Sequence, residues 1–414
     1  NRNGEGESIQ CSMQDGVLTA DGVSFALQDS MLVVSEDGMT MTLSREKPEA
    51  AGASIPVIDE SATLEEMREN LRRGSYILIR EGSAAKNLRT LLPGVTPGNA
   101  RRCAFCCDDR HIEDIVSDGH MDNHLRLAVG MGMDPVQAIT MCTLNAAECF
   151  GLRNKGAIAP GRDADFILVD DLKAFRVRKV FTAGRLIAED GRVLIPLDDA
   201  AAGAPSHSIH LKPLAEDALS LPVRTGKARV IGIEPASLVT KSLVREVKTD
   251  DAGCFQSALN PGLTKIAVIE RHKRTGKLGI GILEGYGLTG GAIATTISHD
   301  SHNIVVAGDN DPDMLLAVRE LADMGGGIVS VHGGAIRRLP LPIAGLMTSA
   351  DPQEVNAVLH DMLVAARAEL GIPEDVEPFM TLSFMALPVI PELKLTARGL
   401  FNVNTFSFVG VEAD

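Results

Sequence analysis

The fold is decided by the stretch Arg102-Cys103-Ala104-Phe105-Cys106-Cys107-Asp108-Asp109-Arg110-His111, in which a short apolar run ends abruptly in two aspartates. A second apolar run at 76–80 precedes it and is followed by the small-residue loop 81–87. Both runs have the length of buried strands, and helical patterns follow them. Strand, loop and helix in this order predict a parallel α/β layer, in which functional groups gather at the carboxyl ends of the strands.

The two aspartates need compensation if they lie at the end of a buried strand. Removing carboxylates from water costs free energy unless a metal, an arginine or backbone donors offset the loss. Asp108 could then bind a metal and take a proton from an activated water. Both residues could equally cap the following helix, where acidic side chains are favoured. His111 and His120 lie nearby, but a lone histidine is more often structural, so local chemistry leaves both interpretations open.

Capping and turn patterns predict the remaining helices and strands of the first half of the chain. Thr63 and Glu66 form a capping-box pattern that predicts a helix ending at Gly74. Two further helices are predicted at 119–132 and 134–149. Before residue 56, Asp-Gly pairs at 15–16, 21–22 and 37–38 break up predicted strands at 16–19, 23–27 and 31–34, and a Pro/Ala/Gly-rich linker follows at 48–56.

From residue 156 onward the pattern changes to short strands. We expect a strand at 164–169 and a hairpin over 177–188 that turns at Ala183-Gly184. A bridge rich in Pro, Ala, Gly and Ser at 196–207 then leads into a region of mixed strands and helices over about 210–410. The chain therefore has more than one structural unit.

The composition is that of a globular, acidic protein. The 414 residues are 45% hydrophobic, enough for two or three domains with real cores. A formal net charge of -15 argues against a nucleic-acid or membrane-surface partner, because phosphate binding needs a basic face. No apolar run reaches the ~18 residues of a membrane span, no signal peptide is visible, and an odd number of cysteines favours a reducing compartment. We expect a cytoplasmic protein and, because the first residue is Asn1 rather than Met, a fragment or a processed chain.

A second polar cluster, Ser298-His299-Asp300-Ser301-His302-Asn303, follows the apolar run 291–297. His299 and His302 are three residues apart with Asp300 between them, a spacing that could bind a metal or orient a substrate. The alternative is a polar turn between two strands. Six consecutive hydrogen-bonding side chains favour a functional role.

Other motifs indicate packing and turns. Cys103 and Cys106 form a C-x-x-C, but a structural zinc needs a second ligand pair, which the sequence lacks at a suitable spacing. The glycine-rich segments 285–291 and 325–327 lack the strand–loop–helix setting of a phosphate loop. No Gly-x-Ser-x-Gly occurs, so nothing supports a serine hydrolase.

Taken together, these segments resemble adenine deaminases of the amidohydrolase superfamily over roughly residues 60–410. The matching stretches of the first half are 72–88, 107–111 with Gly119-His120, 134–147 and 156–165, and the more specific C-terminal ones are 269–272, 298–303, 339–347, 378–384 and 391–395.

The resemblance implies an α/β fold with a partial metal-dependent hydrolase (β/α)8 barrel, a small β-sandwich domain and a C-terminal α+β domain of the adenine-deaminase type. The expected division is an unassigned β-rich segment at 1–55, the C-terminal part of the barrel at 56–155, the small β domain at 156–200 and the C-terminal domain at 208–414.

The same resemblance implies hydrolytic deamination of adenine to hypoxanthine and ammonia by a metal-activated hydroxide. The family works with manganese or iron in a binuclear site, and the expected partners are a purine substrate and a second copy of the chain in a homodimer. Asp108 matches the last-strand aspartate that binds metal and moves the proton, so it is the implied catalytic and metal-binding residue. The implied substrate-binding residues are Glu81, Ser83, Asp109, His111, His299, Asp300 and His302.

The chain departs from the family pattern at the metal site. The first-strand His-x-His pair and a His-Ala-Pro-Gly segment have no counterpart, and Asp59 stands where the family has a histidine. About 100 residues look like barrel, whereas a complete barrel needs about 250. Two alternatives stay open: an inactive or truncated paralogue that binds purine or a partner without catalysis, and an amidohydrolase acting on another aminopurine or a cyclic amide.

Overall fold

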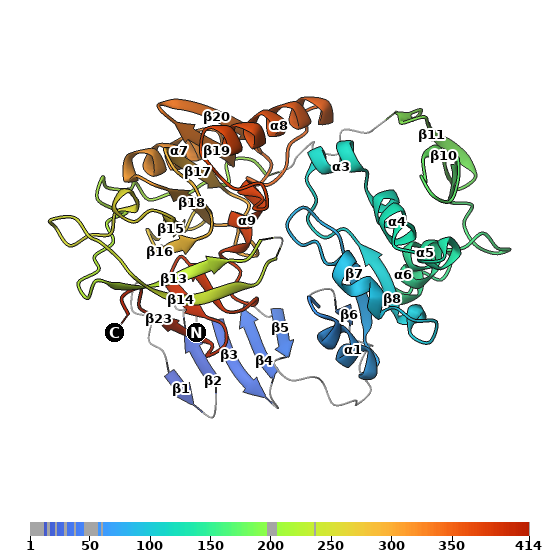
Figure 1. Ribbon diagram of the computed structural model, residues 1–414, viewed down its shortest axis with the longest axis horizontal. Coiled ribbons are helices and arrows are strands. Elements are labelled where there is room, and N and C mark those ends of the chain that lie inside the picture. Colours follow the sequence, from blue (N-terminus) through green and yellow to red (C-terminus); the bar gives the residue numbers. More distant parts are fainter. Residues whose placement is uncertain are drawn as a thin grey trace.

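The structure is a computed structural model that describes residues 12–14, 17–20, 23–28, 31–36, 39–44, 57–58, 61–196, 205–235 and 237–413. Within these residues the chain is a mixed α/β protein with five separate sheets. The segment 57–155 lies beside the C-terminal region, and the polar strand-end loops face the junction between them (Figure 1).

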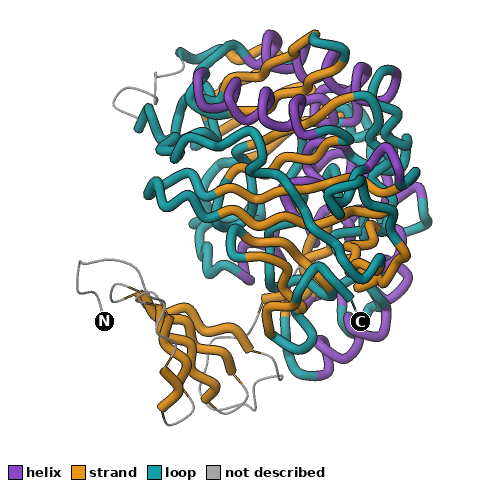
Figure 2. Tube along the Cα trace, turned by 90° about the vertical axis from the view of Figure 1, so that its left-hand side faces the viewer, coloured by secondary structure: helices purple, strands orange, loops and turns teal. Residues whose placement is uncertain are grey.

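The N-terminal strands form an antiparallel sheet in sequence order. Three of its strands coincide with the predicted runs, whereas the predicted Asp-Gly turns and the linker 48–56 lie outside the described residues. Figure 2 shows this sheet to one side of the rest of the chain. Its strands are β1 (Ser12–Gln14), β2 (Val17–Ala20), β3 (Val23–Gln28), β4 (Met31–Glu36) and β5 (Met39–Ser44).

A three-stranded parallel sheet holds the apolar runs on either side of loop 81–87. Its order is β6 (Val57–Ile58), β7 (Tyr76–Arg80) and β8 (Cys103–Cys106), so the predicted parallel pairing is confirmed. The helix α1 (Leu64–Arg72) connects β6 to β7 and begins at the predicted capping box. In that box the Thr63 hydroxyl accepts from the Glu66 N–H, and the Glu66 carboxylate accepts from the Thr63 N–H. The short helix α2 (Leu88–Leu91) and the 3-10 turns η1 (Leu92–Gly94) and η2 (Ala100–Arg102) connect β7 to β8.

Four helices follow β8, where two were predicted. They are α3 (Ile112–Asp118), α4 (Met121–Gly130), α5 (Pro135–Cys142) and α6 (Leu144–Cys149). The predicted helix 119–132 starts late because Gly119, at φ 95°, ends α3. The prediction of one helix over 134–149 is wrong, since Thr143 leaves helical geometry and its hydroxyl donates to the Ile139 carbonyl. The buried Asn145 amide then donates to the carbonyls of Ala100 and Cys103, which directs α6 against β8.

A four-stranded antiparallel sheet follows, in the order β12-β11-β10-β9. The predicted hairpin is confirmed: β10 and β11 are joined by Ala183 and Gly184, both at positive φ, as a tight two-residue hairpin turn requires. The predicted β-sandwich around this sheet stays a prediction. The strands are β9 (Phe166–Val169), β10 (Val177–Thr182), β11 (Arg185–Glu189) and β12 (Arg192–Val193).

Eight strands of the C-terminal region form one sheet in the order β14-β13-β16-β15-β18-β17-β19-β20. Its pairs are antiparallel except for the parallel contact of β13 with β16. The strands are β13 (Lys227–Ile233), β14 (Thr240–Glu246), β15 (Leu263–Ile269), β16 (Leu278–Glu284), β17 (Gly291–Thr295), β18 (Ile304–Gly308), β19 (Gly327–His332) and β20 (Ala335–Pro340), with η3 (Ser257–Leu259) before β15.

Helices cover both faces of this sheet, which explains why the central strands β17 and β18 are buried at every position. Ala294 and Val306 pack with α7 (Asp311–Asp323) on one face. Alternate residues such as Ile293 and Val305 pack on the other face with α8 (Pro352–Ala368) and α9 (Pro378–Phe384). A small sheet of β21 (Leu393–Thr396), β22 (Gly399–Asn402) and β23 (Ser407–Val409) joins that second layer. Among the described residues, no helix has the length and apolar character needed to span a membrane.

Candidate functional site

The loops after β7 and β8 lie at the same edge of the parallel sheet. The Glu81 N–H donates to the Cys106 carbonyl at 3.1 Å, and the Ser83 N–H donates to the Asp109 carbonyl at 2.9 Å. Gly82 lies between them, where an added Cβ would come within 2.6 Å of the Cys107 carbonyl oxygen. Only glycine therefore allows the two loops to approach this closely.

The buried side chain of Arg110 forms hydrogen bonds that connect the same loops. Its guanidinium donates to the carbonyls of Glu81 at 3.0 Å, Gly119 at 3.1 Å and Asp114 at 3.4 Å. The side chain is 3% exposed and lies 3.7 Å from the Asp118 carboxylate. One buried side chain thus holds both strand-end loops and the start and end of α3.

Asp108 is compensated by an arginine, one of the three possibilities that the sequence left open. Its Oδ2 lies 3.6 Å from a terminal nitrogen of Arg80, a buried residue at the end of β7. Asp108 has φ 55°, a left-handed conformation that aspartate and asparagine tolerate better than most residues. The carboxylate is therefore fixed at the strand end beside a buried positive charge.

Asp109 reaches across the junction to the second predicted cluster. Its Oδ2 lies 3.0 Å from Nε2 of His299, whose ring packs against Phe384 with centroids 4.6 Å apart. The hydrogen bond from His299 lowers the pKa of Asp109, although partial burial opposes the shift. Burial lowers the pKa of His299, but the hydrogen bond and charge of Asp109 outweigh it, so that pKa is raised above 6.5. Both shifts favour the protonated imidazole of His299 beside the ionised carboxylate of Asp109.

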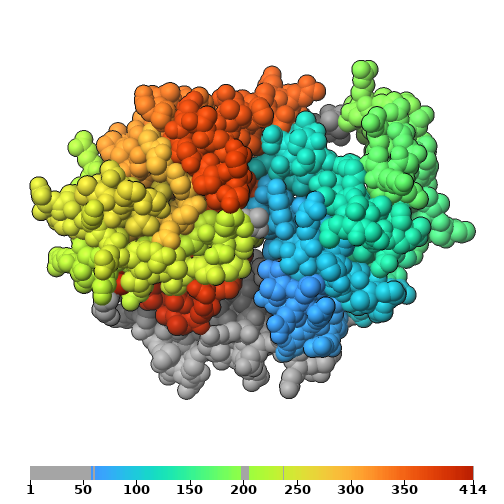
Figure 3. Space-filling model, viewed as in Figure 1, coloured from blue at the N-terminus to red at the C-terminus, as the bar shows by residue number. Residues whose placement is uncertain are grey.

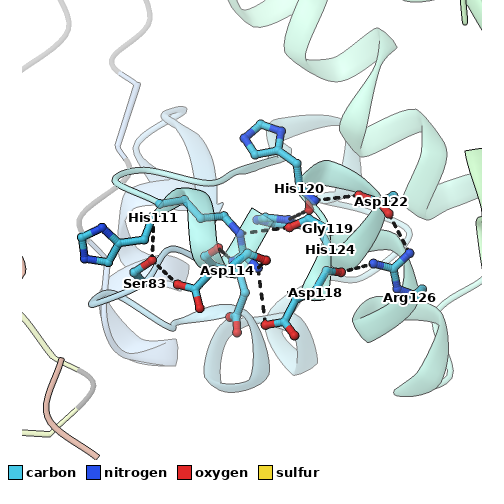
Figure 4. Close-up of polar contacts among 11 residues, drawn as sticks. Ser83, His111, Asp114, Asp118, Gly119, His120, Asp122, His124 and Arg126 are labelled. Carbon is cyan, nitrogen blue, oxygen red and sulfur yellow. Dashed lines mark hydrogen bonds and ion pairs between the residues drawn. The ribbon is translucent and has the colours of Figure 1, made fainter. Parts of the chain in front are cut away.

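His111 forms a second pair across the junction. Its Nε2 lies 3.0 Å from Oε1 of Glu377, the residue before α9. The His111 backbone N–H donates to the Ser83 hydroxyl at 2.9 Å, and that hydroxyl donates in turn to Asp114, as Figure 4 shows. Burial lowers the pKa of His111, but Glu377, Asp114 and Asp109 outweigh it and the net pKa is raised above 6.5.

A pocket of about 190 Å³ lies between these two pairs. It is smaller than the ~300–1,000 Å³ of typical ligand sites, so it suits a small molecule. Figure 3 shows the surface of the surrounding junction, where the cyan atoms around α3 lie against the orange and red atoms of the C-terminal region. The lining residues are Asp109, Arg110, His111, Thr295, Ile297, His299, Ile328, Phe379, Met380 and Ser383.

The structure brings some predicted site residues to this pocket and leaves others outside its lining. Asp109, His111 and His299 line it. Ser83 reaches it only through the His111 backbone. Two of the remaining predicted residues are at the strand ends: Asp108 pairs with Arg80, and the buried Glu81 accepts from the Leu88 N–H. Of the other two, Asp300 is exposed, and His302 accepts from the Ser298 N–H through Nδ1.

The described residues around Asp108 do not by themselves fit a metal ion. Among the described residues, no group of three or more His, Cys, Asp or Glu side chains could hold one. The nearby carboxylates are instead matched with Arg80 and His299. Asp59 lies outside the described residues. The Cys103 thiol is fully buried, and burial raises its pKa to about 12, which agrees with packing rather than metal binding.

Several residues of the site carried no usable signal in the sequence. Glu377 precedes Pro378, a pair that predicts a helix start, but nothing in the pattern predicts its contact with His111, 266 positions away. His124 is fully buried with both ring nitrogens near backbone carbonyls, those of His120 and Cys106. Burial lowers its pKa, although the contacts with the Cys106 and His120 carbonyls oppose the shift, and a single sequence does not reveal this structural role.

The His299–Asp109 pair predicts a pH-dependent contribution to stability. Because the pKa of His299 is raised in the folded chain, the pair stabilises fully below pH 6.5 and loses its effect as pH rises through the higher folded value. We expect His299→Gln to lower the free energy of unfolding at about pH 5.5 by up to about 1 kcal/mol, given solvent screening of Asp109, and by less at about pH 8.5. Urea unfolding at both pH values measures this, with the exposed His210→Gln as control. A deficit that grows with pH would contradict the assignment.

Two protein-family models match this chain. Residues 237–407 match the model of the adenine deaminase C-terminal domain, and residues 1–187 match the amidohydrolase family. The amidohydrolase match starts at residue 1, so it includes the segment before residue 60, where no resemblance was expected.

Three curated relatives are named as adenine deaminases. An adenine deaminase of Nitratidesulfovibrio vulgaris (strain Hildenborough) is 55% identical over 403 residues, which cover 96% of this chain and 69% of that protein. Adenine deaminase 2 of Desulfotalea psychrophila is 46% identical over 88% of this chain and 63% of that protein. Adenine deaminase of Geobacillus kaustophilus is 46% identical over 87% of this chain and 63% of that protein. The chain thus spans about two thirds of the length of these relatives.

Similarity to solved structures is low. A β-aspartyl dipeptidase of Fervidobacterium islandicum AW-1 is 26% identical over 33% of this chain and 36% of that chain, with a TM-score of 0.27. A similarity at this level does not inform the fold.

Proposed function

Because the chain belongs to the adenine deaminase family of amidohydrolases, we propose that its function is the hydrolytic deamination of adenine to hypoxanthine and ammonia. In this reaction the oxygen of water bonds to the ring carbon that bears the amine, and ammonia leaves as the C–N bond breaks. The protein must therefore hold a small planar heteroaromatic ring and accept and return a proton.

The pocket at the junction is the observation that carries the proposal. Ile297, Phe379 and Met380 offer apolar surface to a planar ring, whereas Asp109, His111 and His299 offer groups that can bond its nitrogens. The shifted pKa values of these three side chains are typical of functional sites. A small mixed pocket of this kind suits a purine base better than a larger nucleotide.

Asp108 is the proposed proton acceptor. It stands at the carboxyl end of β8, directly before the pocket residue Asp109, and its carboxylate lies 3.6 Å from the Arg80 guanidinium. Four further residues are proposed to face the purine because of the family pattern alone: Glu81, Ser83, Asp300 and His302. The family implies manganese or iron, but the described residues do not fit a metal, so no step is assigned to one.

We also propose the domain division at 1–55, 56–155, 156–200 and 208–414. The division is supported by the sheets, because the sheets of these segments share no strands. The first segment is a five-stranded sheet, the second would be the C-terminal part of a barrel, and the fourth includes the match to the adenine deaminase C-terminal domain.

A hybrid enzyme tests the proposed function. Residues 60–414 would be joined to the part of the Nitratidesulfovibrio vulgaris relative that precedes its counterpart of residue 60. With adenine and manganese, we expect the hybrid to form hypoxanthine, followed by the change in ultraviolet absorbance. The 414-residue chain alone should show little or no turnover. Its sequence contains no histidine before His111, so it lacks the first-strand His-x-His pair that the family uses to bind metal.

Two outcomes would contradict this proposal. A folded hybrid that binds adenine without deaminating it would favour the alternative of a purine-binding paralogue. Robust turnover by the chain alone would mean that the catalytic groups are not where we place them.

A further inference from the structure

His111 is shared by two cavities at the junction. It lines the pocket of about 190 Å³ and also a wider cleft of about 750 Å³. The cleft contains Ser83 and Asp114 from the strand-end side and Arg367 and Glu377 from the C-terminal region. The imidazole of His111 therefore stands between the small pocket and the wider cleft.

Among the described residues, only one of the two ring nitrogens of His111 has a protein partner. Nε2 is bonded to Glu377, whereas the described residues provide no partner for Nδ1. Glu377 is itself fixed, because its other carboxylate oxygen caps α9 by accepting from the Met380 N–H. Both side chains are nearly buried, at 14% and 13% exposure. The carboxylate therefore holds the ring from a rigid helix end rather than from a mobile loop.

The chemistry of a carboxylate decides what His111 can offer. An ionised carboxylate only accepts hydrogen bonds, so Nε2 must carry the proton in this pair. Nδ1 is then the free atom: it donates when the ring is protonated and accepts when the ring is neutral. A carboxylate that orients a histidine in this way fixes both its tautomer and its direction.

We propose that Glu377 is a positioning residue, through which the C-terminal region fixes His111 so that Nδ1 donates to a ring nitrogen of the purine. This inference rests on the proposed function, since it names the atom that would recognise the substrate of the same site. It assigns the C-terminal region a part in purine recognition through the orientation of His111.

The charged surroundings of His111 agree with a donor at Nδ1. Glu377, Asp114 and Asp109 raise its pKa against the effect of burial. The other charged or titratable groups facing the cleft are Lys86, Glu113, Glu234, His360, Arg367, Glu374 and Asp375. A neutral residue in place of Glu377 would no longer raise the pKa of His111 against the effect of burial. The pKa would then fall, and the imidazole would lose its proton at lower pH.

The test uses the full 414-residue chain with labelled histidine. We expect Glu377→Gln to lower the pKa of His111 by about 1–3 units in NMR titration and to weaken adenine binding about 10-fold in calorimetry. His111→Gln assigns the resonance. Glu377→Asp, which keeps the charge and remains a good helix cap, should recover part of both effects.

The matched control is Glu374→Gln, three residues away in the same cleft, with a side chain that is 92% exposed. We expect it to change neither the pKa of His111 nor adenine affinity. If Glu377→Gln lowers only thermal stability, with the pKa of His111 and adenine affinity unchanged, Glu377 is merely a cap and the inference fails. If the unaltered chain binds no adenine, the proposed function fails at this pocket, and the assignment of Nδ1 to a purine fails with it.

Discussion

Replacement of Asp108 by asparagine is expected to reduce adenine deamination by the hybrid enzyme about 10²–10⁴-fold, the usual contribution of a general acid–base group. The substitution removes the charge and the proton-accepting ability but keeps the shape of the side chain. Asparagine tolerates the left-handed backbone at this position, where φ is 55°. The loss should therefore appear in kcat and kcat/KM, and steady-state assays with adenine measure both.

Asp134→Asn is the matched control for this experiment. Asp134 is exposed and caps α5 by accepting from the Gln137 N–H, a task that asparagine performs equally well. It should leave turnover within about twofold, as expected for a surface substitution that keeps its cap. Thermal unfolding of Asp108→Asn must be followed in parallel, because the change leaves buried Arg80 without this counter-charge. If a folded Asp108→Asn hybrid retains near-normal kcat, Asp108 is not the proton acceptor.

Local features of this fold could be predicted from the sequence because they depend on neighbouring residues. The capping box of Thr63 and Glu66 and the hairpin turn at Ala183-Gly184 involve residues within a few positions of one another. The polar ends of β7 and β8 were predictable because parallel strands bring their carboxyl ends to one edge. The break at Thr143 was not, since it depends on the Asn145 amide reaching β8.

The partners of the charged residues in the candidate site could not be predicted from the sequence. Asp109 and His299 were both candidate residues, but nothing in their own segments indicates that they bond to each other. Glu377 lies 266 positions from His111, and their contact exists only because the start of α9 lies against the strand-end loops. The sequence allowed a metal, an arginine or backbone donors as compensation for Asp108. The choice of Arg80 depends on where a neighbouring strand ends.

Arg110→Met is expected to lower the free energy of unfolding by about 3 kcal/mol and to abolish measurable adenine binding. Methionine replaces the apolar part of the side chain but leaves the carbonyls of Glu81, Gly119 and Asp114 without these donors. A buried polar group that loses its partner costs about 1–3 kcal/mol, which sets the size of the effect. Urea unfolding and adenine calorimetry on the 414-residue chain measure the two losses.

Arg110→Lys separates geometry from charge in this prediction. Lysine keeps the positive charge near Asp118, but its single ammonium group cannot reach three carbonyls that the planar guanidinium contacts in different directions. We therefore expect Arg110→Lys to lose most of the stability that Arg110→Met loses, whereas the exposed Arg89→Met should change little. If lysine restores full stability and adenine binding, the loops are held by charge alone. The close approach of the Glu81–Ser83 and Asp108–His111 backbones would then depend on Gly82 and the sheet rather than on Arg110.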